Sequence, residues 1–112
     1  MMERYQQWDL RYYRDNGEKY YVFVNRKSGK VLDVPELSTR DGVQLIQYEY
    51  NGGKNQDFRL KKTRGKYYRI QCRHSGKYVD VKRSSLGEGA PVIQKNKKNE
   101  NFKSQEWYFD RV

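Results

Sequence analysis

Four polar and aromatic residues have the types and spacing that sugar recognition would need. Asp33 precedes Tyr48 by 15 residues, and Asn55 and Gln56 follow shortly afterwards. A sugar has hydroxyl groups on its edge and C–H groups on its face, so a site for it needs a carboxylate, an amide and an aromatic ring. The alternative is that Asp33 only stabilises its own hairpin and that Tyr48 is one of 11 tyrosines.

A second set of residues has a similar spacing but is incomplete. Asp80 is followed 15 residues later by Lys95 instead of an aromatic residue, and Ser104 precedes Gln105 where the first set has an asparagine. Stacking on an aromatic ring contributes on the order of 1 kcal/mol. We therefore expect a degenerate second site, formed by Asp80, Lys95 and Gln105, that binds neutral sugars weakly.

Positive charge is concentrated in the second half of the chain. The 24 Lys and Arg and 14 Asp and Glu give a net charge of +10. Residues 1–56 contribute 9 basic and 8 acidic residues, and residues 57–112 contribute 15 and 6, so the halves carry +1 and +9. This balance is compatible with an anionic polymer as partner, or with a plain solvated loop. The candidate lysines are Lys95, Lys97, Lys98 and Lys103.

Catalytic and metal-site patterns find little support. Cys72 and His74 are each single in the chain, whereas a nucleophilic site needs a base and an orienting partner, and a zinc site needs three or four ligands. We expect a surface His74 and a half-buried Cys72, with no enzyme activity, no cofactor and no metal. No apolar run approaches the roughly 18 residues of a membrane span, and the first residues lack the apolar region of a signal peptide, which leaves localisation unknown.

The candidate residues belong to a sequence repeat. Residues 20–34 align with residues 67–81 at an offset of 47, with eight of 15 positions identical. Repeats of this length indicate a repeated structural unit. Three Gln-x-aromatic triplets recur at spacings of 50 and 49 residues. We expect their aromatic residues to pack in the core and their glutamines to bond backbone or neighbouring turns. These aromatic residues are Trp8, Phe58 and Trp107.

Short strands separated by turns must position these side chains. Aromatic and β-branched residues favour a half-buried pleated sheet, and the Ser-Gly pairs favour tight turns. No segment has a sustained apolar spacing of three and four residues, so the chain is predicted to be all-β. The expected strands of one unit are 20–25, 31–34, 43–48 and 58–60, and the next begins at 67–72.

These motifs resemble those of the ricin-type β-trefoil lectins, whose hallmark is a threefold Gln-x-Trp repeat. Three segments carry the resemblance: residues 25–34, the Asp-Gly pair at 41–42, and residues 51–58. The resemblance implies a β-trefoil that binds a galactose-type or xylose-type glycan without catalysis, in a family that is commonly secreted. It also implies the roles of four residues: Asp33 as acceptor, Tyr48 as stacking platform, Asn55 as amide contact and Gln56 as support.

The chain departs from the family pattern in length. A trefoil has three four-stranded repeats, whereas residues 1–15 match only the last strand of one repeat, followed by full repeats at 16–62 and 63–112. Missing strands leave open sheet edges, which attract pairing partners. We therefore expect a β-trefoil-like single domain that is incomplete at its N-terminus, with a homodimer through open edges as a hypothesis. A start codon assigned too late, or completion by another chain, are the alternatives.

Two other functions compete with sugar binding. The basic second half could bind nucleic acid or a sulfated glycan, since proteins that stack bases also combine basic grooves with aromatic residues. Alternatively, the domain could be a structural or assembly platform whose sugar sites have decayed. Salt dependence separates the first alternative from binding of a neutral sugar, because phosphate-driven affinity falls steeply with ionic strength.

Overall fold

The computed structural model describes residues 7–82, 91–100 and 102–109. These ranges contain strands and short 3-10 turns but no α-helix, so the all-β prediction is confirmed. The strands are β1 (Trp8–Asp15), β2 (Glu18–Asn25), β3 (Val31–Asp33), β4 (Ile46–Tyr48), β5 (Phe58–Lys62), β6 (Tyr68–Cys72), β7 (Tyr78–Val81) and β8 (Val92–Lys95). The 3-10 turns are η1 (Pro35–Leu37), η2 (Lys54–Gln56) and η4 (Phe102–Gln105).

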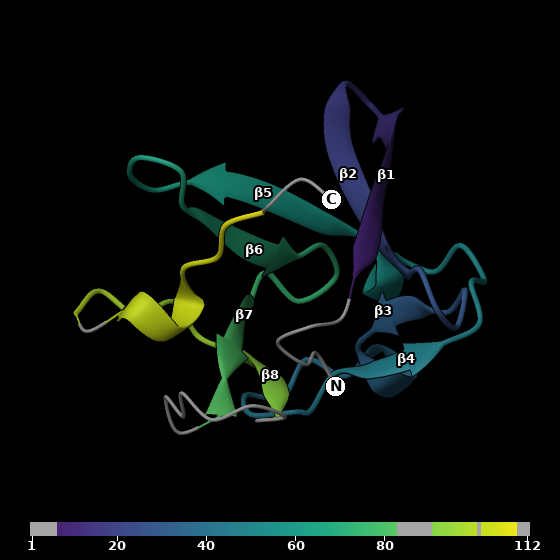
Figure 1. The fold of residues 1–112 in the computed structure, drawn as a ribbon. Coiled ribbons are helices and arrows are strands. Elements are labelled where there is room, and N and C mark those ends of the chain that lie inside the picture. The colour runs from purple at the N-terminus through teal and green to yellow at the C-terminus, as the bar shows by residue number, and fades with distance from the viewer. Residues whose placement is uncertain (1–6, 83–90, 101, 110–112) are drawn as a thin grey trace.

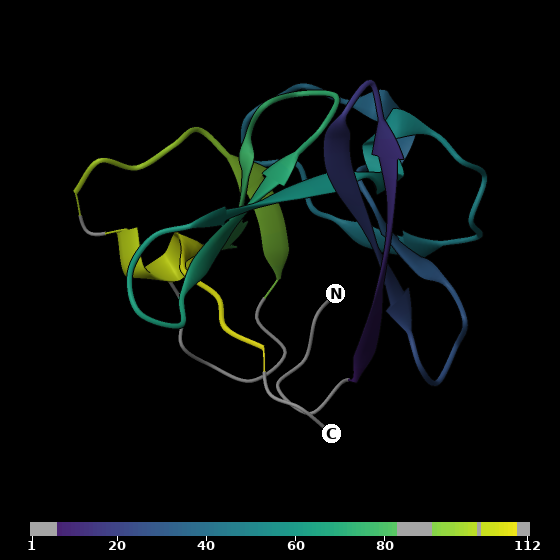
Figure 2. The same cartoon turned by 90° about the horizontal axis from the view of Figure 1, so that it is seen from above.

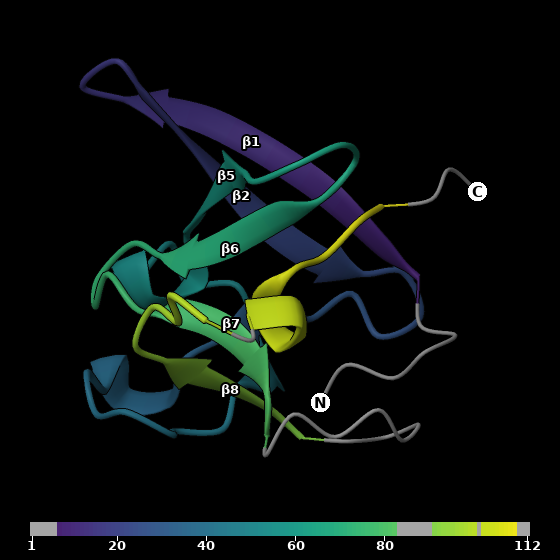
Figure 3. The same cartoon turned by 90° about the vertical axis from the view of Figure 1, so that its left-hand side faces the viewer.

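All strands pair antiparallel in one strongly curled sheet (Figure 1). The order is β4-β3-β2-β5-β6-β7-β8, and β1 pairs with β2 off this path. The β1–β2 hairpin extends well beyond the other strands (Figure 3). Its turn is Asn16-Gly17, with φ angles of 49° and 80°, as two-residue type I′ hairpin turns require.

The core lies inside the curl. Its centre includes Phe23 of β2 and Phe58 of β5, whose rings meet edge to face with centroids 5.6 Å apart. Phe58 is fully buried, and Trp8 and Trp107 are partly buried and pack against the same cluster. Trp107 Nε1 donates to the Val79 carbonyl at 3.1 Å. The three aromatic residues of the Gln-x-aromatic triplets therefore all contribute to one core.

Local hydrogen bonds recur at the sequence offset. Ser28 Oγ donates to Gln47 Oε1 at 2.8 Å, and 47 residues later Ser75 Oγ donates to Gln94 Oε1 at 2.9 Å. The glycine after each serine has a φ of 74°, a conformation that side chains with a Cβ rarely adopt. Matching residues therefore build matching turns and place Asp33 and Asp80 at equivalent points.

A partly buried ionic cluster joins β1, the residue that follows η2 and the β6–β7 turn. Arg73 lies 3.2 Å from Asp57 and 2.5 Å from Asp15 through its two guanidinium nitrogens, and the Tyr13 hydroxyl donates to Asp57. Burial is the main cause that raises the pKa of Tyr13 to about 12, and the hydrogen bond to Asp57 adds to it. The cluster connects segments 58 residues apart in sequence.

Two places in the sheet depart from a regular repeat. β1 pairs with β2, and no other described strand lies on its far side. Beside β6, an isolated bridge between Tyr68 and Trp107 stands where a fourth strand of the last repeat was expected. The segment after Trp107 runs towards the β1–β2 side (Figure 2), where the Phe109 ring lies 6.2 Å from that of Phe23. No helix in the described ranges is long and apolar enough to cross a membrane.

Candidate functional site

The Asp33 carboxylate lies at the end of β3 and is held by two amides of η2. Gln56 Nε2 donates to Asp33 Oδ2 at 2.8 Å, and Asn55 Nδ2 lies 3.3 Å from Oδ1. Asn55 also donates to the Val34 carbonyl at 2.9 Å. The carboxylate is almost fully buried, at 3% exposure. The structure thus brings together three of the four residues predicted for this site.

Gln56 supports the site and the fold together. Its Nε2 donates to the Glu49 carbonyl at 2.9 Å, and the Asn51 amide donates to its Oε1 at 2.9 Å. All polar atoms of this fully buried side chain therefore have partners, as a stable buried amide requires. A Cβ at Gly53 would lie 2.5 Å from Asn55 Oδ1, so the turn needs glycine at this position.

An open pocket of about 700 Å³ lies over Asp33. Tyr48, Asn55 and Ile46 line it together with the η1 segment. Tyr48 is 53% exposed, so its ring can take a stacked ligand. Two further lining residues, Glu36 and Leu37, have φ angles of 59° and 53°, a costly conformation for residues with a Cβ. Tyr48, the fourth predicted residue, therefore lines the same pocket as the carboxylate.

The environment of Asp33 shifts its ionisation. Burial raises the pKa of this carboxyl group above its ordinary value, although the amides of Gln56 and Asn55 and the nearby His74 act in the opposite direction. His74 was expected at the surface, but it is partly buried and its Nε2 lies 2.6 Å from the Ser38 carbonyl. His74 thus contacts the backbone directly after η1, the segment that lines the pocket.

The equivalent carboxylate in the last repeat contacts a lysine. Gln105 Nε2 donates to Asp80 Oδ2 at 3.1 Å, which repeats the Gln56–Asp33 contact. Lys98 Nζ lies 3.2 Å from the same Oδ2 and 3.0 Å from Ser104 Oγ. Asp80 is 1% exposed. Sequence reasoning missed Lys98 as the partner of Asp80, although its alignment with Asn51 at the offset of 47 was a usable signal.

Lys95, which was expected to form the second site together with Asp80, pairs with a different carboxylate. It stands at the aromatic position, but its Nζ pairs with Asp41 at 3.0 Å. Two of the four lysines proposed for an anionic partner, Lys95 and Lys98, are therefore already in ion pairs. Their charges are partly neutralised within the chain, which weakens the case for this cluster as a docking patch.

Within the described ranges, no three His, Cys, Asp or Glu side chains gather as a metal site would need. Cys72 was expected to be half-buried but is completely buried, and this burial raises its pKa to about 12. A thiol in this state is not nucleophilic at neutral pH, because the thiolate is the reactive form.

Comparison with known proteins identifies the family to which this chain belongs. A family model described as ricin-type beta-trefoil lectin domain-like matches residues 4–95. Among curated proteins, no sequence matches the chain. Among solved structures, the designed three-fold symmetric protein ThreeFoil has 43% identity and a TM-score of 0.83, and the match covers 95% of this chain and 72% of ThreeFoil.

Two natural proteins share the fold. The exo-β-1,3-galactanase 1,3Gal43A from Clostridium thermocellum has 39% identity and a TM-score of 0.79 over 91% of this chain and 21% of the enzyme. The Polyporus squamosus lectin has 22% identity and a TM-score of 0.72 over 89% of this chain and 34% of the lectin. Because the family model spans most of the chain and the fold agrees, the chain belongs to the ricin-type β-trefoil lectin domain-like family.

Proposed function

We propose that this chain is a non-catalytic carbohydrate-binding module that binds a galactose-type or xylose-type unit of a glycan in the Asp33 pocket. Membership of the lectin-like family supports carbohydrate binding in general. The 39% identity to a domain-sized part of an exo-β-1,3-galactanase favours a galactose-type sugar.

The observation that carries this proposal is the position of the Asp33 carboxylate. Its oxygens are held by the amides of Asn55 and Gln56, and it faces an open pocket that Tyr48 also lines. Each carboxylate oxygen retains acceptor capacity beyond one amide bond. The carboxylate can accept sugar hydroxyls while the Tyr48 ring stacks on the C–H face. One shallow site of this kind gives millimolar to high-micromolar affinity, or roughly 4–6 kcal/mol.

Removal of the stacking ring tests the proposal. We expect Tyr48→Ala to weaken binding of galactose or xylose roughly 2- to 10-fold, because an aromatic contact contributes about 0.5–1.5 kcal/mol. Isothermal titration calorimetry measures the affinity, and circular dichroism checks the fold. Tyr108→Ala is the matched control, because Tyr108 is similarly exposed but does not line the pocket. Unchanged affinity in a folded Tyr48→Ala variant, or equal loss in both variants, contradicts the assignment.

Binding of a polyanion is the competing function, and salt dependence separates the two. Affinity for nucleic acid or a sulfated glycan through the basic half falls steeply with ionic strength, whereas stacking on a neutral sugar responds little. The ion pairs of Lys95 and Lys98 argue against this alternative. If neither a neutral glycan nor a polyanion binds at any salt concentration, the third possibility, a structural domain with decayed sites, is favoured.

Homodimerisation through sheet edges also remains a proposal. Its support is that β1 pairs with β2 alone among the described strands, and an unpaired edge is a template for another strand. Light scattering across a range of protein concentrations tests it. A mass that stays at 13.6 kDa at every concentration rules the dimer out.

A further inference from the structure

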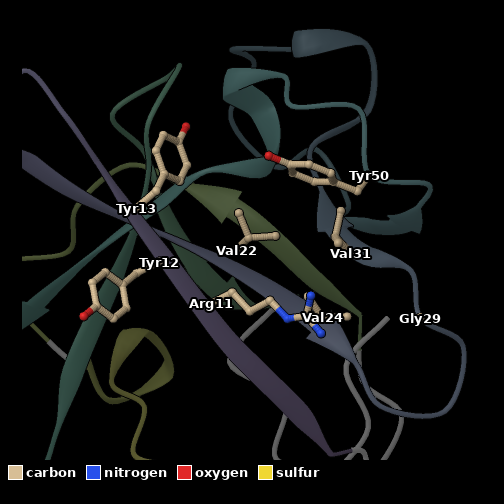
Figure 4. Close-up of a pocket in the computed structure, with 8 residues that line it drawn as sticks. All are labelled: Arg11, Tyr12, Tyr13, Val22, Val24, Gly29, Val31 and Tyr50. Carbon is tan, nitrogen blue, oxygen red and sulfur yellow. The ribbon is translucent and has the colours of Figure 1, made fainter.

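A second, smaller pocket of about 270 Å³ lies beside the β1–β2 hairpin (Figure 4). Val22, Val24 and Val31 form its apolar floor, and the rings of Tyr13 and Tyr50 stand on either side of Val22. Pockets for drug-sized ligands measure about 300–1,000 Å³, so this volume suits a single monosaccharide.

The pocket lies on the outer face of the hairpin. Arg11 pairs with Val22 in the β1–β2 register, and the neighbouring pair of Leu10 and Phe23 points into the core. Because successive side chains of a strand point to opposite faces, Arg11 and Val22 lie on the face opposite this core cluster, where Arg11 is exposed and Val22 is covered by its neighbours. The Arg11 side chain extends along the pocket towards Val24 (Figure 4). A cation therefore lies next to an apolar floor.

Two polar groups of this pocket are available to a ligand. Within the described ranges, Arg11 makes no hydrogen bond or ion pair, and the hydroxyl of the 57% exposed Tyr50 has no hydrogen-bond partner. The Tyr13 hydroxyl, in contrast, is committed to Asp57 and Arg73. Asp57 is itself paired with Arg73. The nearby carboxylate is thus neutralised and does not compete for Arg11.

The smaller pocket adjoins the Asp33 pocket. Val31, which lines the smaller one, pairs across the β3–β4 ladder with Tyr48, which lines the larger one. Directly opposed residues of an antiparallel pair lie on the same face, with Cβ atoms about 4.5–5.5 Å apart. Tyr50 follows Tyr48 by two residues and forms the next wall. One cross-strand pair therefore separates the two pockets, which a glycan can span.

We propose that the β1–β2 pocket is a second subsite of the same glycan site, and that it takes a sugar residue carrying a negative charge. This inference rests on the proposed function of the Asp33 pocket. The charged group, a carboxylate or a sulfate ester, pairs with the Arg11 guanidinium, which suits both geometries. The sugar ring packs between the Tyr50 ring and the three valines. The chain is then selective for acidic ends or branches on a galactose-type glycan.

The test compares three disaccharides that differ only in the charge of the terminal ring. They are β-1,3-galactobiose, its sulfated form and galacturonosyl-β-1,3-galactose, titrated calorimetrically at low and high salt. We expect wild-type protein to prefer one or both acidic disaccharides about two- to fivefold, as an exposed ion pair allows. Arg11→Gln removes this preference without changing affinity for β-1,3-galactobiose. Arg14→Gln, which removes the same charge outside the pocket, keeps it.

The outcomes distinguish this inference from the proposed function. If β-1,3-galactobiose binds and loses affinity in Tyr48→Ala, but no acidic preference exists, the Asp33 site stands and the second subsite is wrong. If Arg11→Gln and Arg14→Gln reduce the preference equally, only the overall charge of the chain attracts the ligand, and the subsite is also wrong. If the acidic preference that depends on Arg11 is unchanged in Tyr48→Ala, the two pockets bind independently, and the inference that they form one glycan site is wrong. If no disaccharide binds, both proposals fail.

Discussion

The Lys98 ammonium group lies 3.2 Å from Asp80 Oδ2. The backbone amide of Lys98 donates to Gln105 Oε1 at 3.1 Å, as that of Asn51 donates to the other repeat's glutamine at 2.9 Å. Lys98 and Asn51 therefore occupy equivalent places. Asn51 lines the open pocket over Asp33, whereas Lys98 forms an ion pair with Asp80 and neutralises its charge. In the last repeat, Lys98 therefore occupies the carboxylate that a sugar hydroxyl would need as its hydrogen-bond acceptor.

Restoring the aromatic residue of the last repeat is not expected to restore a site. In Lys95→Tyr the ring returns to the stacking position, but Lys98 still pairs with Asp80. We expect calorimetric titration with galactose to give one sugar per chain for both wild type and this variant. A stoichiometry of two in either protein would show that the Lys98–Asp80 pair opens readily to a ligand.

Gln56→Leu is expected to damage stability and binding together. The substitution leaves the buried Asp33 Oδ2 without its amide partner and removes the hydrogen bonds to the backbone of the exposed Glu49 and Asn51. A buried group left unsatisfied costs about 1–3 kcal/mol, and each lost hydrogen bond adds about 0.5–1.5 kcal/mol, so we expect a loss of about 2–4 kcal/mol in the free energy of unfolding. Urea denaturation measures it.

Gln47→Leu is the control for this substitution. The Gln47 side chain accepts one exposed hydrogen bond from Ser28, and surface substitutions usually change stability by less than about 0.5 kcal/mol. If the two variants are equally stable, Gln56 is not the link between site and core that its contacts indicate.

Binding is expected to weaken in mild acid. Because burial raises the pKa of Asp33, its carboxylate gains a proton at a higher pH than an ordinary Asp, whose pKa is about 3.9. Protonation removes the charged acceptor, so affinity falls as pH falls through the raised pKa. Calorimetry between pH 7 and the onset of acid unfolding measures the midpoint. A midpoint at or below the ordinary value contradicts this account.

The contribution of Asp33 to stability has the opposite sign. With its folded pKa above its unfolded pKa, the folded state holds the proton more tightly between the two values. The protonated group therefore favours folding at low pH, and this contribution is lost as pH rises through the interval. NMR titration of the carboxyl carbon of Asp33 follows the same group directly.

Arg73→Ala is expected to destabilise the fold strongly. Asp57 is 1% exposed and would lose its cation, and breaking a buried ion pair costs about 3–5 kcal/mol. The expected loss in thermal or urea denaturation is on the order of 3 kcal/mol. Arg59→Ala, which breaks a pair with the exposed Glu18, serves as a control and should cost far less. Similar losses would show that Asp57 is solvated in solution.

Much of the fold could be predicted because short sequence motifs recur in each repeat and determine its local structure. The Ser-Gly turns and the Gln-x-aromatic triplets determine local hydrogen bonds, which the structure shows at matching places. The family and the β-trefoil class followed from them. The Asn16-Gly17 hairpin is equally predictable, since Asn-Gly is the strongest short hairpin signal.

The contacts between separate loops were less predictable. Lys98 meets Asp80, and Lys95 meets Asp41, because of how loops from different segments pack. Tyr50 borders the second pocket only because the β1–β2 hairpin passes beside it. No spacing in the sequence encodes these distances. The residues of the Asp33 pocket were found because they lie within one repeat, whereas those of its neighbour come from two.

Gln56 has a practical consequence for finding the natural ligand. Because its amide holds Asp33 before any sugar arrives, a ligand needs no folding step and stabilises the native state through mass action. At ten times its dissociation constant, a sugar adds about 1.4 kcal/mol to the free energy of unfolding. Even weak ligands should therefore raise the melting temperature measurably, and unlabelled glycans can be screened by thermal shift.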